Sequence, residues 1–336
     1  MRKIGIIGAG SWGTALAVNL ARNNHEVVIW SIMEDEIKML NEHREHIDKL
    51  PGVKLEEVIS FTTDMEAAIK GMDMLVLAVP SIFSRSTSKS MAPFVVEGQI
   101  IACVGKGIED NTFKTITDIV EEEIPQADVA VLCGPSHAEE VGQGLPTTVV
   151  AGAHSQKTAE FIQDTFMNET FRVYTSPDML GMELGGSFKN VIALAAGMCD
   201  GLGFGDNTKA ALIVRGISEV ARLAVAMGAK PETVNGLTGV GDLIVTCQSR
   251  HSRNRKAGEL MGQGLTMEQA TKEVKMVVEG VYSAKAALAL GKKYYVQMPI
   301  IEEVNKVLFE DKSAKEAVYD LMLREKRIES NALDWR

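Results

Sequence analysis

The chain has 336 residues, which is more than one typical hydrophobic core holds, so two domains are expected. Its hydrophobic fraction of 46% and charged fraction of 24% are those of an ordinary soluble globular protein. The formal net charge of −10 argues against nucleic acid or an anionic membrane as the main partner, so any anion site must be a local cluster of Lys and Arg.

Short apolar segments alternate with helical patterns over the first half of the chain. Helices are expected over 13–22, over 33–44 behind a capping box from Ser31 to Glu34, and over 65–70 behind Asp64. Most of the apolar segments do not alternate with polar residues, which is typical of parallel strands covered by helices on both faces. The expected strands are 3–7, 26–30, 59–62, 74–79, 100–104 and 129–133, with 147–151 and 171–174 as extra strands at one edge.

The pattern changes after Ser176-Pro177-Asp178. A Ser cap followed by Pro at the first helical position predicts a long helix through Leu194 or beyond. Helical patterns separated by glycine-rich turns follow, with almost no strand signal. The sequence therefore predicts an α/β fold in which an N-terminal Rossmann-type doubly wound sheet (residues 1–180) binds a dinucleotide and an all-helical C-terminal domain (residues 181–336) binds substrate.

The first expected strand ends in the motif Gly8-Ala9-Gly10-Ser11-Trp12-Gly13, which also opens a helix. In this setting Gly8 permits the tight turn, Gly10 lets the backbone approach a pyrophosphate, and Gly13 allows close packing of helix on strand. Ser11 and Trp12 would add contacts to the phosphates and to the flank of the cofactor. The motif predicts a nicotinamide dinucleotide site.

The end of the second expected strand normally reports which dinucleotide is used. An acidic residue there favours NAD, and a nearby Arg favours NADP. Here the segment is Trp30-Ser31-Ile32-Met33, which offers neither. Ser31 could bind a ribose hydroxyl or a 2′-phosphate, so the choice between NADH and NADPH stays open.

Several familiar catalytic arrangements are excluded by spacing. Tyr282 and Lys285 are one residue too close for a Tyr-x-x-x-Lys pair, and His137-Ala138-Glu139-Glu140 is not a metal-binding His motif. His43 and His46 are expected on a charged, solvated helix, so no metal site is predicted. The cysteines are far apart and form no Cys-x-x-Cys pair, and no apolar run approaches the ~18–20 residues that span a bilayer. We expect a cytoplasmic protein without membrane insertion.

Two lysines remain as candidate acid–base groups. Lys106 stands between two glycines directly after an expected strand, at the edge where open α/β sheets bind ligands. Lys189 lies in the long helix beside Gly185 and Gly186, and glycine inside a helix sacrifices about 1 kcal/mol, usually for a close approach. Partial burial and neighbouring cations can lower the pKa of a lysine toward a useful value.

Further polar residues follow strand ends or begin helices. Gly134 and Ser136 follow another expected strand, and Asp242 stands at a helix start where it could cap the helix and orient Lys189. Ser252-Arg253-Asn254 supplies a guanidinium fork with hydroxyl and amide donors, suited to a phosphate or a carboxylate.

Taken together, these residues resemble the bacterial NAD(P)-dependent glycerol-3-phosphate dehydrogenase family from the first glycine motif nearly to the C-terminus. The resemblance rests on Gly8–Ala17, Val79-Pro80, Gly105-Lys106-Gly107, Gly134-Pro135-Ser136 with Ala138-Glu139-Glu140, Lys189-Asn190, the stretch Gly201–Gly216, Gly239-x-Gly241-Asp242-Leu243 and Arg253-Asn254. Relatives that use NADPH often have a basic residue just after the position of Trp30, and this chain departs from them with Ser31-Ile32.

The resemblance implies reversible oxidation of sn-glycerol 3-phosphate to dihydroxyacetone phosphate, supplying glycerol 3-phosphate for glycerophospholipid synthesis, in a homodimer. It implies that Lys189 accepts the proton, with Lys106 and Asp242 as further catalytic residues. The implied substrate contacts are Lys106, Gly134, Ser136, Lys189, Asn190, Asp242, Ser252, Arg253 and Asn254. The implied dinucleotide contacts are Gly8, Gly10, Ser11, Trp12, Gly13, Ser31, Phe83, Lys106, Ala138, Arg253, Val277 and Glu279.

Two other functions fit the same residues. One is a two-domain dehydrogenase for a hydroxy acid or a sugar-acid phosphate, because Arg253 can also pair with a carboxylate. The other is a dinucleotide-sensing protein without catalysis, which would not need both lysines and Asp242.

Overall fold

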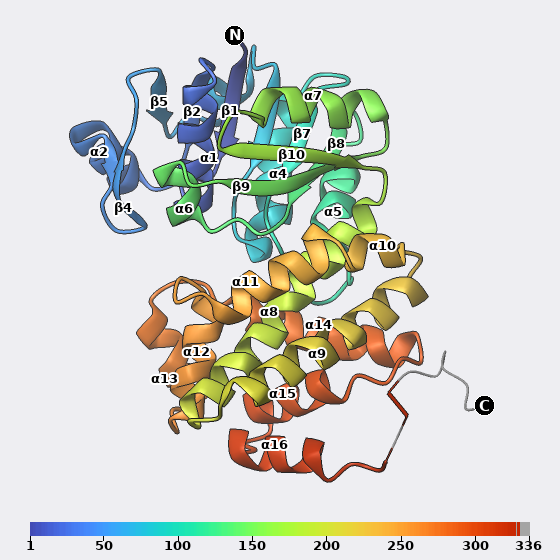
Figure 1. Cartoon of the computed structure of the whole chain (residues 1–336). Coiled ribbons are helices and arrows are strands. Elements are labelled where there is room, and N and C mark those ends of the chain that lie inside the picture. The colour runs from blue at the N-terminus through green and yellow to red at the C-terminus, as the bar shows by residue number, and fades with distance from the viewer. Residues whose placement is uncertain (327, 330–336) are drawn as a thin grey trace.

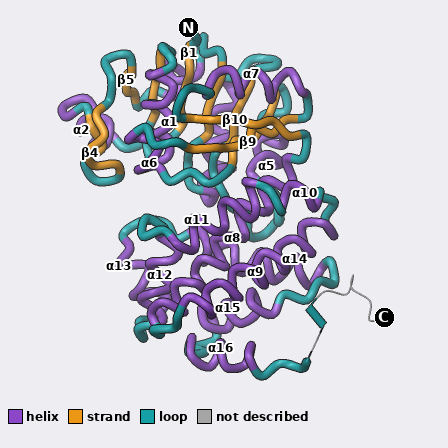
Figure 2. The backbone as a smooth tube through the Cα atoms, viewed as in Figure 1, coloured by secondary structure: helices purple, strands orange, loops and turns teal. Residues whose placement is uncertain are grey.

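A computed structural model describes residues 1–326, 328 and 329 of the chain. It contains a sheet flanked by helices in the N-terminal half and an assembly of helices in the C-terminal half (Figures 1 and 2). The long helix α8 (Met179–Gly201) packs against strands of the sheet and against the surrounding helices. None of the helices in the described ranges is long and apolar enough to cross a membrane.

One sheet holds the N-terminal half together. Its neighbouring strands are parallel, except that β8 and β9 are antiparallel. The spatial order is β10-β9-β8-β7-β6-β1-β2-β5, so the chain reverses its direction of growth between β1 and β6, where doubly wound sheets bind ligands. The strands are β1 (Lys3–Ile7), β2 (Glu26–Trp30), β5 (Ile59–Thr62), β6 (Met74–Leu77), β7 (Ile100–Cys103), β8 (Asp128–Cys133), β9 (Thr147–Ala153) and β10 (Phe171–Ser176).

Helices cover both faces of this sheet and bury two separate apolar clusters. Successive residues of a strand point to opposite faces, so Ile6 of β1 lies in one cluster and Ile7 in the other. The predicted Rossmann-type doubly wound fold is confirmed. The helices of this half are α1 (Ser11–Arg22), α2 (Glu34–His43), α3 (Met65–Ile69), η1 (Ser81–Phe83), α4 (Ser84–Met91), η2 (Ala92–Phe94), α5 (Ile116–Glu123), α6 (Ala138–Gln143) and α7 (Gln156–Phe166).

Two predictions around α2 are wrong. Ser31 does not cap this helix, because Met33 is the N-cap residue and the Ser31 hydroxyl bonds to Glu36 inside the helix. His46 is not on a solvated helix, because left-handed Arg44 (φ 51°) ends α2 and the chain enters β3 (Glu45–His46), which pairs with β4 (Leu50–Lys54). His46 is 1% exposed, with Nε2 2.9 Å from Glu36 Oε1.

In its described residues the C-terminal half consists of helices joined by turns and loops, without strands. After α8 come α9 (Asp206–Ala226), α10 (Pro231–Val234), a π-helical turn η3 (Leu237–Gly241), α11 (Asp242–Gln248), α12 (Arg253–Gly262), α13 (Met267–Val274), α14 (Glu279–Lys293), α15 (Pro299–Phe309) and α16 (Ala314–Met322). The predicted start of α8 is corrected, because the helix begins at Met179 rather than at Pro177. Asp178, rather than Ser176, is the N-cap and accepts a hydrogen bond from Gly181 N, while Ser176 still belongs to β10.

Helix α8 is buried on nearly all sides, as a helix at the centre of a helical assembly must be. It contacts α12 through glycines on both helices. A Cβ on Gly197 would lie 1.9 Å from the carbonyl oxygen of Arg255, and a Cβ on Gly258 would lie 2.0 Å from that of Leu194. The absence of side chains at these positions lets the two backbones touch.

Glu183 connects α8 to the sheet half. Its buried carboxylate accepts hydrogen bonds from the amide and the hydroxyl of Thr117, in the first turn of α5. Burial raises the pKa of Glu183 to about 7, although the bonds from Thr117 oppose this shift. The position of α8 beside the sheet is therefore fixed by a polar contact as well as by apolar packing.

We expect Gly258→Ala to lower the thermal unfolding midpoint. Helix propensity alone would favour Ala by about 1 kcal/mol, but the Cβ would collide with backbone, and overpacking costs about 1–3 kcal/mol. Gly205→Ala is the control, since a Cβ there meets nothing within 4 Å at an ordinary φ of −83°. Scanning calorimetry of both variants measures the difference; a higher midpoint for Gly258→Ala would contradict the contact.

Candidate active site

Two lysine side chains from distant parts of the chain meet at one carboxylate. Lys106 Nζ donates to Asp242 Oδ2 at 2.8 Å, and Lys189 Nζ donates to Asp242 Oδ1. Asp242 is 1% exposed and Lys189 is 6% exposed, so both charges are withdrawn from water. The structure thus brings together the two lysines and the aspartate that the sequence singles out.

Each of the three side chains is placed by a different element. Lys106 follows β7 in the loop at the carboxyl edge of the sheet and also donates to the Gly134 carbonyl oxygen at 3.2 Å. Lys189 projects from the middle of α8. Asp242 is the first residue of α11, directly after the π-helical turn, and it does not cap that helix with its side chain.

The glycines beside Lys189 make room for other parts of the protein. A Cβ on Gly185 would lie 2.9 Å from the Thr238 carbonyl oxygen, and one on Gly186 would lie 2.9 Å from Cys133 Sγ and 3.6 Å from Lys106 Cγ. The close approach expected from these glycines is therefore that of η3, of β8 and of Lys106 itself.

Burial and mutual charge set the protonation of the cluster. Burial lowers the pKa of Lys189 to about 8, a shift opposed by the Asp242 carboxylate and reinforced by the Lys106 ammonium. For Lys106, burial acts in the same sense but the Asp242 carboxylate outweighs it, so its pKa is raised. The two lysines likewise outweigh burial at Asp242 and keep its pKa below the usual value. Lys189 is thus the member that can exchange a proton near neutral pH.

Sequence reasoning missed Thr246, which completes the environment of Lys189. Thr246 Oγ1 donates to the Asp242 carbonyl oxygen at 2.6 Å and accepts from Lys189 Nζ at 2.7 Å. The signal available in the sequence was its spacing of four residues from Asp242, which puts both on one face of a helix. Held by Asp242 and Thr246, the Lys189 amine has one remaining direction in which to meet a reactant.

The glycine turn after β1 has the form of a phosphate cradle. Gly8 has φ 120°, and a Cβ on Gly13 would lie 2.2 Å from the Gly8 carbonyl oxygen, so both positions require glycine. A Cβ on Gly10 would meet nothing within 4 Å, which leaves open space in front of the first turn of α1, where Ser11 and Trp12 lie. Backbone amides at a helix start with open space before them fit a pyrophosphate.

The glycine turn and Lys106 share one edge of the sheet. A Cβ on Gly8 would lie 2.7 Å from the carbonyl oxygen of Ala78, and one on Gly105 would lie 3.2 Å from that of Val79. The chain leaving β6 therefore runs between the two loops, at the point where the sheet changes direction.

The predicted anion-binding segment begins α12. Ser252 caps this helix by accepting from Arg255 N at 3.2 Å, and Arg253 Nη1 donates to the Val277 carbonyl oxygen at 3.3 Å. Asn254 Nδ2 donates to Asn190 Oδ1 at 3.0 Å, next to Lys189 in sequence. The segment is thereby tied to α8 and to the residues before α14.

The other predicted residues lie around the same edge but make contacts of different kinds. Glu279, the first residue of α14, accepts from Ser81 N at 3.2 Å across the two halves of the chain. Phe83 follows in η1 and is 50% exposed. Ser136 Oγ donates to the Gly134 carbonyl oxygen at 2.9 Å, and Ala138 begins α6. Ser31 lies farther along the edge, at the end of β2.

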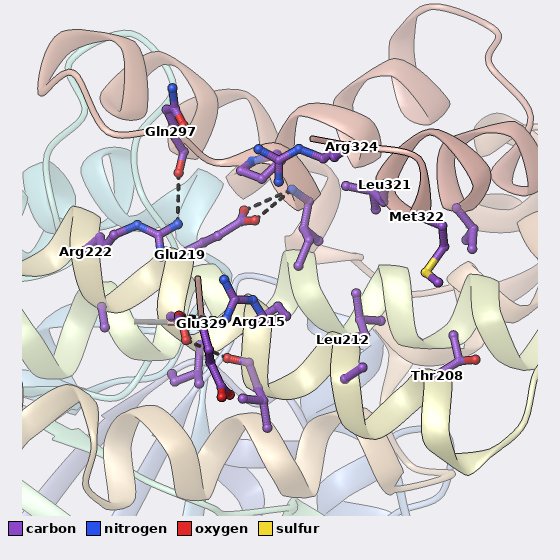
Figure 3. A pocket seen from close by; sticks show the side chains of 18 of the residues that line it. Thr208, Leu212, Arg215, Glu219, Arg222, Gln297, Leu321, Met322, Arg324 and Glu329 are labelled. Atoms are coloured by element: carbon purple, nitrogen blue, oxygen red, sulfur yellow. Dashed lines mark hydrogen bonds between the residues drawn. The ribbon is translucent and has the colours of Figure 1, made fainter. Parts of the chain in front are cut away.

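A cavity of about 1480 Å³ lies elsewhere, between α9, the turn before α15 and α16 (Figure 3). Leu212, Leu321 and Met322 line it together with arginines, and Glu219 accepts from Ile300 N at 2.9 Å beside it. None of the predicted site residues lines this cavity, so the cavity is separate from the lysine cluster of the candidate active site.

A Rossmann-type sheet with a phosphate cradle, and a buried lysine on a second, helical half that meets a lysine of the sheet half, define the class of dinucleotide-dependent oxidoreductases. Residues 3–159 match the family model for the N-terminus of NAD-dependent glycerol-3-phosphate dehydrogenase, and residues 178–319 match the model for its C-terminus. The chain therefore belongs to the NAD-dependent glycerol-3-phosphate dehydrogenase family.

Individual relatives are similar to this chain over nearly its whole length. It is 74% identical over 336 residues to the glycerol-3-phosphate dehydrogenase [NAD(P)+] of Agathobacter rectalis, with 100% of both chains covered. It is 57% identical over 331 residues to the enzyme of the same name from Fusobacterium nucleatum, covering 98% of this chain and 99% of that one. The crystal structure of glycerol-3-phosphate dehydrogenase from Coxiella burnetii superposes with a TM-score of 0.93 at 36% identity, covering 96% and 99% of the two chains.

We expect Asp242→Asn to destabilise the protein strongly. Removing one partner of a buried ion pair costs about 3–5 kcal/mol, here because the charge of Lys106 loses its counter-charge and Lys189 must give up its proton. The pKa of Lys189 should also fall further, because the Asp242 carboxylate opposes its depression. Denaturant unfolding measures the first effect, and NMR titration of the lysine side chains measures the second.

Asp320→Asn serves as the matched control, because it removes the same charge from an exposed carboxylate that pairs with Lys312. Exposed pairs contribute about 0–1 kcal/mol. Equal destabilisation by the two substitutions would contradict the buried cluster.

Proposed function

We propose that this chain catalyses the reversible NAD(P)-dependent oxidation of sn-glycerol 3-phosphate to dihydroxyacetone phosphate. The observation that carries the proposal is the bonding of Lys189 and Lys106 to the two oxygens of buried Asp242, at the carboxyl edge of a doubly wound sheet. Membership of the family, at high identity over the whole chain, supports the same activity.

Lys189 is the proposed acid–base group. In its neutral form its two N–H groups can donate to Asp242 and Thr246, which leaves its lone pair for the proton of the substrate hydroxyl. Lys106 is the proposed partner that holds and polarises the reacting oxygen, and Asp242 is proposed to orient both lysines. A nicotinamide cofactor held at the glycine turn from Gly8 to Gly13 would supply the hydride acceptor for oxidation and the hydride donor for reduction. One proton and one hydride leave the alcohol, so the step is balanced.

The remaining predicted contacts are proposed as follows. Arg253, with Ser252 and Asn254, would hold the substrate phosphate, since a guanidinium can form paired hydrogen bonds to it. Asn190, Gly134 and Ser136 would line the same place. The dinucleotide would lie along Gly8, Gly10, Ser11, Trp12 and Gly13 and contact Ser31, Phe83, Lys106, Ala138, Arg253, Val277 and Glu279. The open space before Gly10 supports this path.

We also propose a domain division, an assembly and a cellular setting. A division near residue 180, between dinucleotide-binding and substrate-binding domains, agrees with a change from strands to helices there. A homodimer through the helical half would cover Val214, Met322 and Leu323, which are 54%, 76% and 82% exposed near the cavity of Figure 3. The four free cysteines fit a cytoplasmic setting, in which the product would supply glycerophospholipid synthesis.

The test of the activity is Lys189→Met in a dihydroxyacetone phosphate reduction assay. General acid–base groups contribute about 10²–10⁴-fold, so we expect at least that loss in turnover number while dinucleotide binding, followed by fluorescence titration, is kept. Lys209→Ala is the control, because Lys209 pairs with Asp200 outside the cluster.

A Lys189→Met variant with more than a few per cent of normal turnover would remove Lys189 from the mechanism. Wild-type enzyme that reduces a hydroxy-acid precursor or a sugar-acid phosphate faster than dihydroxyacetone phosphate would refute the proposed substrate.

We expect kcat/KM to change with pH in opposite senses for oxidation and for reduction. Oxidation needs neutral Lys189, so kcat/KM for glycerol 3-phosphate should rise with pH and level off above about 8, the pKa of this amine. Reduction needs the protonated form, so kcat/KM for dihydroxyacetone phosphate should fall through the same range. Steady-state rates from pH 6 to 10 check both; the same sign in both directions would exclude Lys189 as the titrating group.

A further inference from the structure

The residues at the end of β2 bear on the choice between NAD and NADP, which the family name leaves open. In Rossmann folds the residue after the second strand lies beside the adenosine ribose, whose 2′ position distinguishes NAD from NADP. Ser31 occupies this position, directly after Trp30, the last residue of β2. The inference below rests on the proposed dinucleotide-dependent activity and asks which dinucleotide the site accepts.

The hydroxyl of Ser31 is already committed as a donor. It donates to Glu36 Oε2 at 2.5 Å and accepts from Met33 N at 3.2 Å. A hydroxyl has one proton and two lone pairs, so Ser31 retains only the capacity to accept one more hydrogen bond. A ribose 2′-hydroxyl can donate that bond. A 2′-phosphate presents acceptor oxygens and needs donors instead.

Glu36 enforces this state of Ser31 because it remains ionised. Burial would raise its pKa, but hydrogen bonds from His46, Lys49 and Ser31 outweigh burial and lower the pKa to about 2. An ionised carboxylate can only accept, so the proton of Ser31 must point toward it. The Lys49 ammonium forms an ion pair with the same carboxylate, so it is held there as the counter-charge of Glu36.

The surroundings of Ser31 are also unfavourable for a phosphate. Ile32 and Met33 follow it, and both are exposed and apolar. The first turn of α2 then carries Glu34, Asp35 and Glu36. A helix start normally attracts anions, but three carboxylates at this one oppose a further negative group.

We propose that this chain prefers NAD(H) to NADP(H), and that Glu36 is the positioning residue that keeps Ser31 an acceptor for the ribose 2′-hydroxyl. The acidic group that usually ends the second strand is here delivered by the following helix, one hydrogen bond removed from the ribose.

The primary experiment measures binding and turnover separately on the full-length protein. NADH and NADPH are titrated by protein fluorescence, and kcat/KM is measured for each in dihydroxyacetone phosphate reduction. We expect NADH to bind about tenfold more tightly or better, since juxtaposed like charges oppose the 2′-phosphate. Equal or tighter binding of NADPH would overturn the proposal.

Glu36→Gln tests the positioning role, because it removes the charge at nearly constant shape and allows the Ser31 proton to turn outward. The ratio of NADPH to NADH affinity should rise by about tenfold. Glu45→Gln is the matched control, because Glu45 lies in the adjacent β3 and bonds to Lys54 and Gly52, away from Ser31. A loss of structure around β3 would weaken both cofactors together, whereas loss of discrimination changes their ratio.

Two further variants keep the proposal falsifiable if Glu36→Gln unfolds. Ser31→Ala should weaken NADH binding and leave NADPH binding nearly unchanged, because only the 2′-hydroxyl uses this acceptor. Ile32→Arg, at a side chain that is 79% exposed, should strengthen NADPH binding by adding the missing donor. If either of these variants changes the affinities for NADH and NADPH by the same factor, the proposal fails.

Failure of the activity itself is distinguishable from failure of this inference. A protein that binds NADH more tightly than NADPH but reduces no dihydroxyacetone phosphate would refute the proposed reaction and support the cofactor preference. A protein that reduces dihydroxyacetone phosphate faster with NADPH, and binds NADPH more tightly, would support the proposed reaction and refute the cofactor preference.

Discussion

The buried carboxylate of Asp242 is the constraint on which the site depends. The Lys189 ammonium could not be held this far from water without it, because an isolated buried charge costs several kcal/mol. Placing all three groups together requires the loop after β7, the middle of α8 and the start of α11 to converge. The carboxylate raises the pKa of both lysines, but burial prevails at Lys189 and not at Lys106, so the pKa falls at Lys189 and rises at Lys106.

Helix α8 makes that convergence possible because it belongs to both halves of the molecule. Its first turns reach the sheet half through Glu183 and Thr117, and its later turns pack backbone to backbone on α12 through Gly197 and Gly258. Lys189 lies between these two regions. A helix fixed at both ends can present a charged side chain in a defined direction, as proton transfer requires.

Much of the fold and the centre of the site follow from local sequence. The β-branched apolar runs predict the strands, and the glycine spacing at 8, 10 and 13 predicts the turn after β1. Lys106 is predictable because parallel strands end at a common edge. The contact of Thr246 with Lys189 escaped prediction because it joins segments far apart in the sequence, and the contacts of Glu36 with His46 and Ser31 escaped because they depend on where α2 begins and ends.

The sequence by itself determined the strands of the main sheet, the glycine turn after the first strand and the identity of the charged residues, because these depend on side-chain pattern within a few residues. Only the tertiary structure decided which carboxylate each lysine meets and which buried groups shift their pKa. Those properties depend on distance and desolvation, and both are set by the packing of segments that lie far apart along the chain.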